Sequence, residues 1–442
     1  MGNKQVHWLA IVASMLATVW FAHLYATTPV PLPVSTAARN NVTAAPAHHV
    51  LLRIPDAVAA KAPQPIAIDA ALARRALQTG ELRVALPDGT SYPVRIERQY
   101  TDETGHWNVV GRVQTRLGPQ PMVLTFGGNV VFGTLPTPDG SRMRIETGPG
   151  GEIQMTPGGG LVPNGAWGIA VGDALPPPQP TLDKSSVIVD GPALVAVAAP
   201  KTRAAAQAHS QSDTTPVRID VLALYATQQV ALRGGRRTVE AEIAHLLALT
   251  NQAHIDSGSR VRLRAVGVKP VDAASNDDNL ATLAQLASLP IAETTVAALR
   301  DAAHADLVTL LRPNAPGDAT CSAAYVPGQA GAGGDAGYSV SNADNGCGAL
   351  VFAHVIGHNL GSVHDRGAEI GDHDAQGAYA FSRGYRVRGS FATIMASPDG
   401  DAWVPYFSTP VATPCGASCG VEGAADDVRS FNLMAPAIAA YR

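Results

Sequence analysis

The first half of the chain alternates apolar and polar residues over short runs, as strands with one buried face do. Turn signals separate these runs, and the dipeptides Asp88-Gly89 and Asp139-Gly140 each lie between two of them. Asp-Gly between alternating segments predicts a β-hairpin. The expected strands are 81–86, 92–98, 107–113, 122–126, 130–135 and 143–146. We therefore expect a small, mostly β domain over residues 48–175.

The second half changes to a pattern in which strands and helices alternate. The expected strands are 217–225, 260–271 and 306–311, and the expected helices are 238–257, 278–289 and 294–303. In the first helix, Thr238 is the expected N-cap and Gly258 the stop. This alternation predicts an α/β domain over residues 217–442, with a central mixed sheet covered by helices.

Two stretches have compositions that do not bury a core. Residues 29–47 are rich in Pro, Ala and Thr, and residues 176–216 begin with three prolines and continue through Ala, Lys, Ser and Gln. We interpret both as linkers, and the second as a flexible one.

The N-terminus has the pattern of an export signal. Lys4 precedes a nearly continuous apolar run over residues 8–26, and small residues and prolines follow. We expect residues 1–28 to be a signal peptide. An uncleaved membrane anchor is the alternative, because the run is about long enough to span a bilayer. Either way the remainder is expected outside the cytoplasm, as a secreted, periplasmic or cell-surface protein.

Composition narrows the partners. The 442 residues suffice for two or three domains, and the net charge of −4 is mild. The sequence has no basic stripe with interleaved aromatic residues, so we do not expect nucleic acid as a partner. We expect a monomer, with a membrane as partner only if the N-terminal segment is retained.

All four cysteines lie in the second half, at Cys321, Cys347, Cys415 and Cys419. An even count in an exported chain predicts disulfides, and pairing of neighbours is the simplest of three connectivities. A second metal site is the alternative, although the spacing fits no zinc pattern well. Because all four cysteines lie in the second half, the first half has no thiol that could bind a metal ion and block its catalytic position.

Three histidines are spaced to bind one metal ion. His354 and His358 are four residues apart, which places them one turn apart on one helix face. Gly361 allows the chain to leave the helix and turn back, so that His364 reaches the same ion. Three neutral imidazoles leave a fourth position for water, which is the catalytic arrangement of Zn²⁺. Ordinary buried core histidines are the alternative.

Residues 354–365 resemble the elongated zinc motif of the metzincin metallopeptidases, H-E-x-x-H-x-x-G-x-x-H-D. Residues 353–366 are most similar to bacterial secreted members of the reprolysin-like, adamalysin-type (M12B-type) group. The resemblance implies a metzincin fold, a Zn²⁺ cofactor, and a peptide or protein substrate. It implies that Met395, in a segment similar to the Met-turn, packs beneath the metal. Asp365 would support the turn or a ligand.

The resemblance extends beyond the zinc motif. Residues 320–327 would be the edge strand against which a peptide pairs. Residues 48–175 are similar to the β-rich N-terminal region of bacterial relatives and would correspond to a propeptide.

The departure from the family pattern is Val355. This position holds the family's glutamate, which takes a proton from zinc-bound water and passes it to the leaving amine. Valine exchanges no proton, and the loss of general acid–base catalysis costs roughly 10²–10⁴-fold in rate. We therefore expect the fold and the zinc site to survive and turnover to be severely reduced.

Two further functions stay open on the sequence alone. The first is a competent protease in which another carboxylate, Asp365, Asp372 or Asp374, reaches the water. The second is a secreted module that binds zinc and peptides without cleaving them, a pseudopeptidase. Other histidines are not expected to bind metal: His245 and His254 on a half-exposed helix face, and His373 in a polar loop.

Overall fold

The computed structural model describes residues 50–53, 63–68, 70–77, 81–85, 90–157, 172–178, 214–318, 320–329, 333–342, 347–367 and 376–442. The expected signal peptide or anchor, the linker at 29–47 and most of the linker at 176–216 lie outside these residues. In the part of the chain that is described, no helix combines the length and the apolar character needed to cross a bilayer.

In the described part of the N-terminal region, the chain forms nine strands and one helix. They are β1 (Val50–Arg53), β2 (Gln64–Pro65), α2 (Ala70–Leu77), β3 (Glu81–Ala85), β4 (Ser91–Thr101), β5 (Trp107–Thr115), β6 (Gly118–Gly127), β7 (Val130–Pro136), β8 (Arg142–Thr147) and β9 (Ile153–Pro157). The strand order is β1-β3-β4-β5-β6-β7-β8-β9-β2, and β3 to β9 pair antiparallel. The predicted β-rich region is therefore present, with Asp139-Gly140 at the β7–β8 turn.

A second, mixed sheet has the order β10-β16-β17-β15-β11-β12. Its strands are β10 (Ala174–Leu175), β11 (Val217–Ala226), β12 (Val261–Val271), β15 (Leu307–Arg312), β16 (Ser322–Tyr325) and β17 (Tyr338–Asn342). The pairs β11–β12, β11–β15 and β15–β17 are parallel, whereas β16 runs antiparallel to β17. This sheet and its helices form the predicted α/β region.

The helices of this region are α3 (Thr227–Leu232), α4 (Arg236–Ser257), α5 (Asn279–Leu286), α6 (Val296–Ala302), the 3₁₀ turn η2 (Gly334–Ala336), α7 (Leu350–Asn359) and α8 (Asp427–Ile438). Short strands complete it: β13 (Pro290–Ile291), β14 (Thr294–Thr295), β18 (Arg386–Val387), β19 (Phe391–Ala392) and β20 (Ala402–Trp403). The N-cap prediction for α4 was wrong, because the helix begins earlier, after Gly235. Gly258 ends it as predicted, since its φ of 83° suits glycine.

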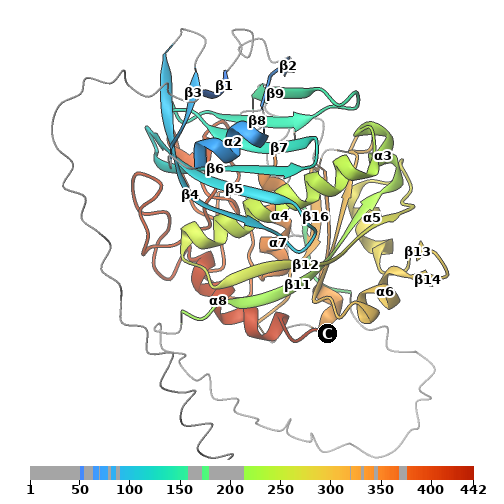
Figure 1. The fold of residues 1–442 in the computed structure, drawn as a ribbon. Coiled ribbons are helices and arrows are strands. Elements are labelled where there is room, and N and C mark those ends of the chain that lie inside the picture. Colours follow the sequence, from blue (N-terminus) through green and yellow to red (C-terminus); the bar gives the residue numbers. More distant parts are fainter. Residues whose placement is uncertain are drawn as a thin grey trace, which may run out of the picture. The chain divides into compact units, whose positions relative to one another are not determined.

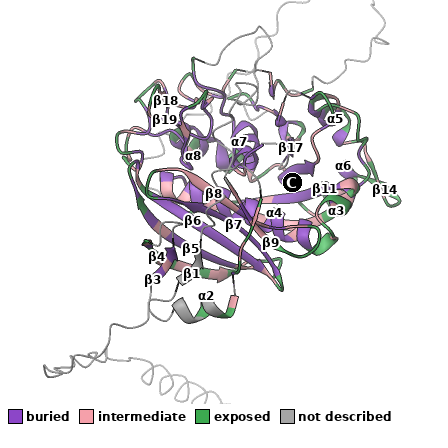
Figure 2. Cartoon of the chain, turned by 90° about the horizontal axis from the view of Figure 1, so that it is seen from above, coloured by how far each residue is buried: buried purple, intermediate pink, exposed green. Residues whose placement is uncertain are grey.

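Helix α4 lies between the two sheets (Figure 1), with β6 and β7 on one side and β12 and α7 on the other. It is buried on nearly all faces, as Figure 2 shows by colour. A helix covered on several sides has no exposed stripe. The half exposure predicted for His245 and His254 was therefore wrong, since these residues are 3% and 0% exposed.

Polar contacts hold α4 against the first sheet. The guanidinium of Arg112 on β5 donates two hydrogen bonds of 2.8 Å to the carboxylate of Asp256. His245 lies 3.2 Å from Thr125 Oγ1 and 3.1 Å from Thr134 Oγ1 through its two ring nitrogens. A bidentate arginine–carboxylate pair that is largely buried fixes orientation as well as adding attraction. The first sheet is thus docked on the α/β region.

Strand β10 belongs to the second sheet. It pairs parallel with β16 and occupies the edge of the sheet order. The sequence-based boundary at residue 175 placed this strand in the β domain, and the pairing places it in the α/β sheet instead. Two residues without a clear alternating pattern give no local signal of which sheet they join.

We expect buried His254 to make the free energy of unfolding depend on pH. Burial, with a smaller effect of Arg262, lowers the pKa of His254 from 6.5 to about 3. Between these values the unfolded chain binds a proton that the native state does not. Stability is therefore present above pH 6.5 and is lost as pH falls toward 3, by about 1.4 kcal/mol per pH unit.

The check is denaturant unfolding of the wild type and His254→Asn between about pH 6 and pH 4. The variant should show a shallower fall, by about 1.4 kcal/mol per pH unit, whatever its stability at neutral pH. Because both proteins share every other titrating group, parallel pH curves would contradict the assignment.

Candidate metal centre

Helix α7 presents two of the predicted histidines on one face. His354 and His358 are one turn apart, as the four-residue spacing requires, and their Nε2 atoms are 2.9 Å apart. Both side chains are buried, at 1% and 0% exposure. Two imidazole nitrogens facing each other in a buried place are suited to share one ion.

The chain leaves α7 as predicted and returns the third histidine. Gly361 has a φ of 91°, in the left-handed region that glycine adopts without strain. Its amide donates a hydrogen bond of 2.8 Å to the His358 carbonyl, which closes the helix end. The turn then places His364 Nε2 3.3 Å from His354 Nε2.

The outer ring nitrogens of two histidines are held by backbone carbonyls. His354 Nδ1 lies 3.0 Å from the Ile394 carbonyl, and His358 Nδ1 lies 2.9 Å from the Ser362 carbonyl. Because a carbonyl only accepts, each Nδ1 carries the proton and donates. The Nε2 lone pairs are then free for a metal.

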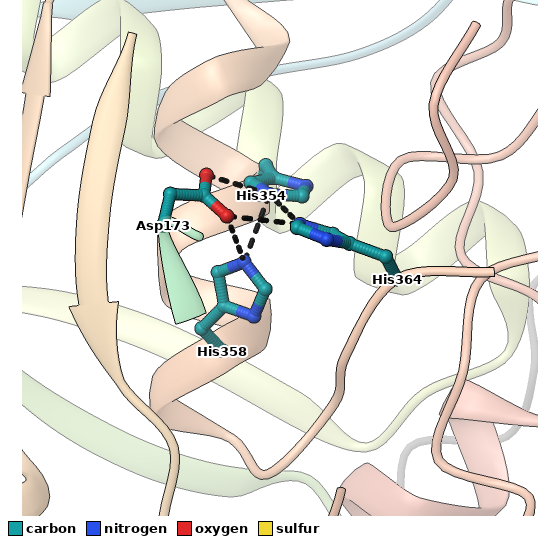
Figure 3. A group of neighbouring side chains, drawn as sticks. All are labelled: Asp173, His354, His358 and His364. Carbon is teal, nitrogen blue, oxygen red and sulfur yellow. Dashed lines mark hydrogen bonds and ion pairs between the residues drawn. The ribbon is translucent and has the colours of Figure 1, made fainter. Parts of the chain in front are cut away.

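A fourth residue, Asp173, reaches the same point (Figure 3). Its Oδ1 is 2.9 Å from His364 Nε2 and 3.4 Å from His358 Nε2, and its Oδ2 is 3.3 Å from His354 Nε2. The side chain is fully buried. One ligand atom from each of the four residues lies within 4.8 Å of the others.

Sequence reasoning missed Asp173. The prediction considered only cysteine thiols as metal ligands from the first half, although a carboxylate also ligates zinc. The available signal was weak: Asp173 is the only acidic residue between Glu152 and Asp183. Nothing local links that position to the histidines, because the link is the pairing of β10 with β16.

The protonation states of Asp173 and His354 are those of residues that bind a cation. Burial pushes the pKa of Asp173 upward, but the nearby His364, His354 and His358 hold it well below its ordinary value. Burial, and next His358, lowers the pKa of His354 to about 4. At neutral pH the set therefore presents an ionised carboxylate and a neutral imidazole at His354, the forms in which these side chains ligate metals.

The geometry fits a zinc ion. Two atoms about 2.0–2.1 Å from one tetrahedral ion are about 3.4 Å apart, and the Nε2 separations measured from His354 are 2.9 and 3.3 Å. Asp173 Oδ1 is buried and makes no hydrogen bond among the described residues, despite its short distance to His364. An unsatisfied carboxylate oxygen facing three imidazole nitrogens is explained by a cation between them.

Met395, the methionine of the predicted Met-turn, packs against α7. The side chain is fully buried, and the Thr393 carbonyl accepts a hydrogen bond of 2.9 Å from Ala396 N in the turn. A Cβ at Gly357, which lies between the two helical histidines, would overlap Met395 Sδ. The methionine therefore lies directly against α7 because position 357 is glycine.

Asp365 supports the turn. Its carboxylate accepts hydrogen bonds of 3.0 Å from Ser397 N and 3.2 Å from Gly367 N. These bonds tie the residue after His364 to the segment around Met395. The four-residue cluster at the metal centre does not include Asp365. Asp372, His373 and Asp374 lie outside the described residues.

Val355 is fully buried on α7, next to His354. Its hydrocarbon side chain offers neither a proton acceptor nor a hydrogen bond. In the described part of the chain, Asp173 is the carboxylate that the metal-ligand group contains.

The cysteines pair as neighbours, in the simplest predicted connectivity. Cys321 bonds Cys347 and Cys415 bonds Cys419, each with Cα atoms 5.6 Å apart. The first bridge joins the residue before β16 to the segment that enters α7. It therefore links the strand beside β10 to the helix of the two histidines.

Comparisons with known proteins found the following similarities. Residues 210–424 match the model of the Metallo-peptidase family M12B, Reprolysin-like. A peptidyl-Asp metalloendopeptidase of Pseudomonas aeruginosa is 33% identical over 255 residues, which are 53% of this chain and 42% of that protein. This chain thus spans less than half the length of that relative. A solved "Structure of a chaperone-substrate complex" is 23% identical with a TM-score of 0.42, over 51% of this chain and 36% of that one.

We expect the Gly357–Met395 contact to appear as a coupling in stability. Gly357→Ala should cost about 1–3 kcal/mol of unfolding free energy, because the added methyl overlaps the Met395 sulfur. In Gly357→Ala/Met395→Ala the overlap is gone. The double variant should therefore be more stable than the sum of the single changes by about 1 kcal/mol or more. Additive effects in chemical denaturation would refute the contact.

Proposed function

We propose that this chain, whose residues 210–424 match the model of the reprolysin-like M12B family of metallopeptidases, is a zinc metalloendopeptidase homologue with severely reduced turnover. The convergence of three buried imidazole Nε2 atoms supports the zinc site. The valine at position 355 supports the loss of turnover, since it is the position of the family's proton-transfer glutamate.

The residues have separate roles in this proposal. His354, His358 and His364 hold zinc, which would lower the pKa of its water toward about 7 and polarise a peptide carbonyl. Met395 and Asp365 fix the helix and turn that carry these ligands. Strand β16 would offer its backbone groups to an extended peptide only after β10, which pairs with it in this structure, is displaced. No residue in this proposal is assigned to the transfer of the proton from the water to the leaving amine.

The relative's name supports peptides as the substrate class and suggests peptides that contain aspartate as the first assay. We further propose that the β-rich region of residues 48–175 is a propeptide, that residues 176–216 include a flexible linker, and that the protein is an exported monomer. The two disulfides support export, since such bonds persist in oxidising compartments.

A competent protease with a substitute carboxylate is less well supported. Asp365 is engaged by two backbone amides, and Asp173 faces the histidines from a ligand position. A pseudopeptidase that binds peptides without cleaving them differs from an impaired enzyme only in its residual rate. Both predict zinc binding, and cleavage assays separate them.

We expect Val355→Glu to restore cleavage. Both proteins should carry Asp173→Ala, so that the carboxylate does not fill the position opposite the histidines. The restored base should raise kcat/KM on an Asp-containing peptide by about 10²–10⁴-fold, while zinc content stays near one ion per chain. Val355→Gln is the matched control, because it has the size of glutamate without its proton chemistry.

The outcomes are distinct. Equal cleavage with and without the glutamate would refute the role assigned to position 355. Absence of zinc from the parent, measured by mass spectrometry of the metal, would refute the zinc site. Cleavage that stays undetectable after restoration, with zinc and tight peptide binding present, would favour the pseudopeptidase.

A further inference from the structure

We propose that Asp173 is the fourth ligand of the metal in the intact chain, and that residues 172–178 hold the centre in a closed, latent state. This inference rests on the proposed zinc site and concerns its regulation. Its basis is that a buried carboxylate from outside the matched region 210–424 points at all three histidines, at 2.9–3.4 Å (Figure 3).

The carboxylate is held in place through its other oxygen and its backbone. Ser322 Oγ donates a hydrogen bond of 2.6 Å to Asp173 Oδ2. The Asp173 carbonyl accepts a hydrogen bond of 2.8 Å from Ala324 N, and the Leu175 carbonyl accepts one of 2.8 Å from Val326 N. Oδ1 is left without a hydrogen bond and aimed at the imidazoles. The bonding of one oxygen therefore orients the other toward the metal position.

The same segment occupies the edge of the sheet. β10 pairs with β16 on the side away from β17, and the order of the sheet begins with β10. An extended peptide that binds by strand addition needs the unpaired groups of an edge strand. With β10 in place, the backbone amides of Ala324 and Val326 are already used. The peptide-binding edge and the fourth ligand position are thus filled together.

A four-ligand zinc site differs in function from a three-ligand one. Zinc with three protein ligands keeps a position for water or substrate, and zinc with four is closed. Because Asp173 is part of the same chain, its effective concentration at the metal exceeds that of an external ligand. The closed state therefore resists competition until the segment is displaced.

The test measures the affinity of a ligand that must reach the metal. Catalytic activity is not used, because Val355 is expected to keep it low in every variant. Zinc-loaded full-length protein is titrated with a peptidyl hydroxamate, which joins a metal-binding group to a strand-forming peptide. Asp173→Asn keeps the shape and the Ser322 contact but is a poor zinc ligand. It should bind the hydroxamate about 10²-fold or more tightly than the wild type.

Two further variants make the result specific. Ser322→Ala removes the hydroxyl that orients the carboxylate and should give a smaller gain in affinity. Asp139→Ala removes a carboxylate from the β7–β8 turn of the first sheet and should leave hydroxamate binding unchanged. Thermal unfolding of each variant checks that the fold persists. The Ser322 variant tests the Asp173 latch, meaning the proposed bond of the Asp173 carboxylate to the metal, even if the Asp173 variant does not fold.

Failure of the latch and failure of the zinc site give different results. One zinc per chain in all proteins, with equal hydroxamate affinity for the wild type and the Asp173 variant, would overturn the latch and leave the zinc site intact. Lack of zinc in the wild type, as in a His354→Ala control, would overturn the zinc site and the latch with it.

Discussion

The meeting of four buried donors at one point is the constraint on which the rest of this structure depends. An ionised carboxylate and three imidazoles, taken out of water without a cation, would leave a charge and several polar atoms uncompensated. A divalent ion between the four side chains would compensate this charge, and the surrounding features then serve to position its ligands. Gly361 turns the chain back, and Gly357 admits Met395 against the helix.

The N-terminal region contributes to the centre through its docking. The first sheet packs on α4, and α4 packs on α7, which carries two of the histidines. The buried Arg112–Asp256 pair and the contacts of His245 fix that interface. Between β9 and β11, the described residues 172–178 bring Asp173 to the metal centre and pair β10 with β16. The segment between the two sheets thus supplies the fourth residue of the cluster.

The local parts of the site were predictable from the sequence, and the long-range parts were not. Three histidines spaced by helix geometry and a glycine turn lie within eleven residues, so their meeting follows from local conformation. The neighbour pairing of the cysteines is similarly short-range. Asp173 reaches the histidines only through strand pairing across the chain, which no periodicity encodes. The burial of His254 likewise depends on segments distant in sequence, since it stacks on Phe407.

A zinc-edge anomalous diffraction map of the intact, zinc-loaded chain is the most direct measurement of this account. It should show one ion bound by Nε2 of His354, His358 and His364 and by the Asp173 carboxylate, each about 2.0–2.2 Å away. A map in which water takes the fourth position and the Asp173 carboxylate is turned away would contradict the closed state. A map without zinc at these histidines would contradict the metal centre itself.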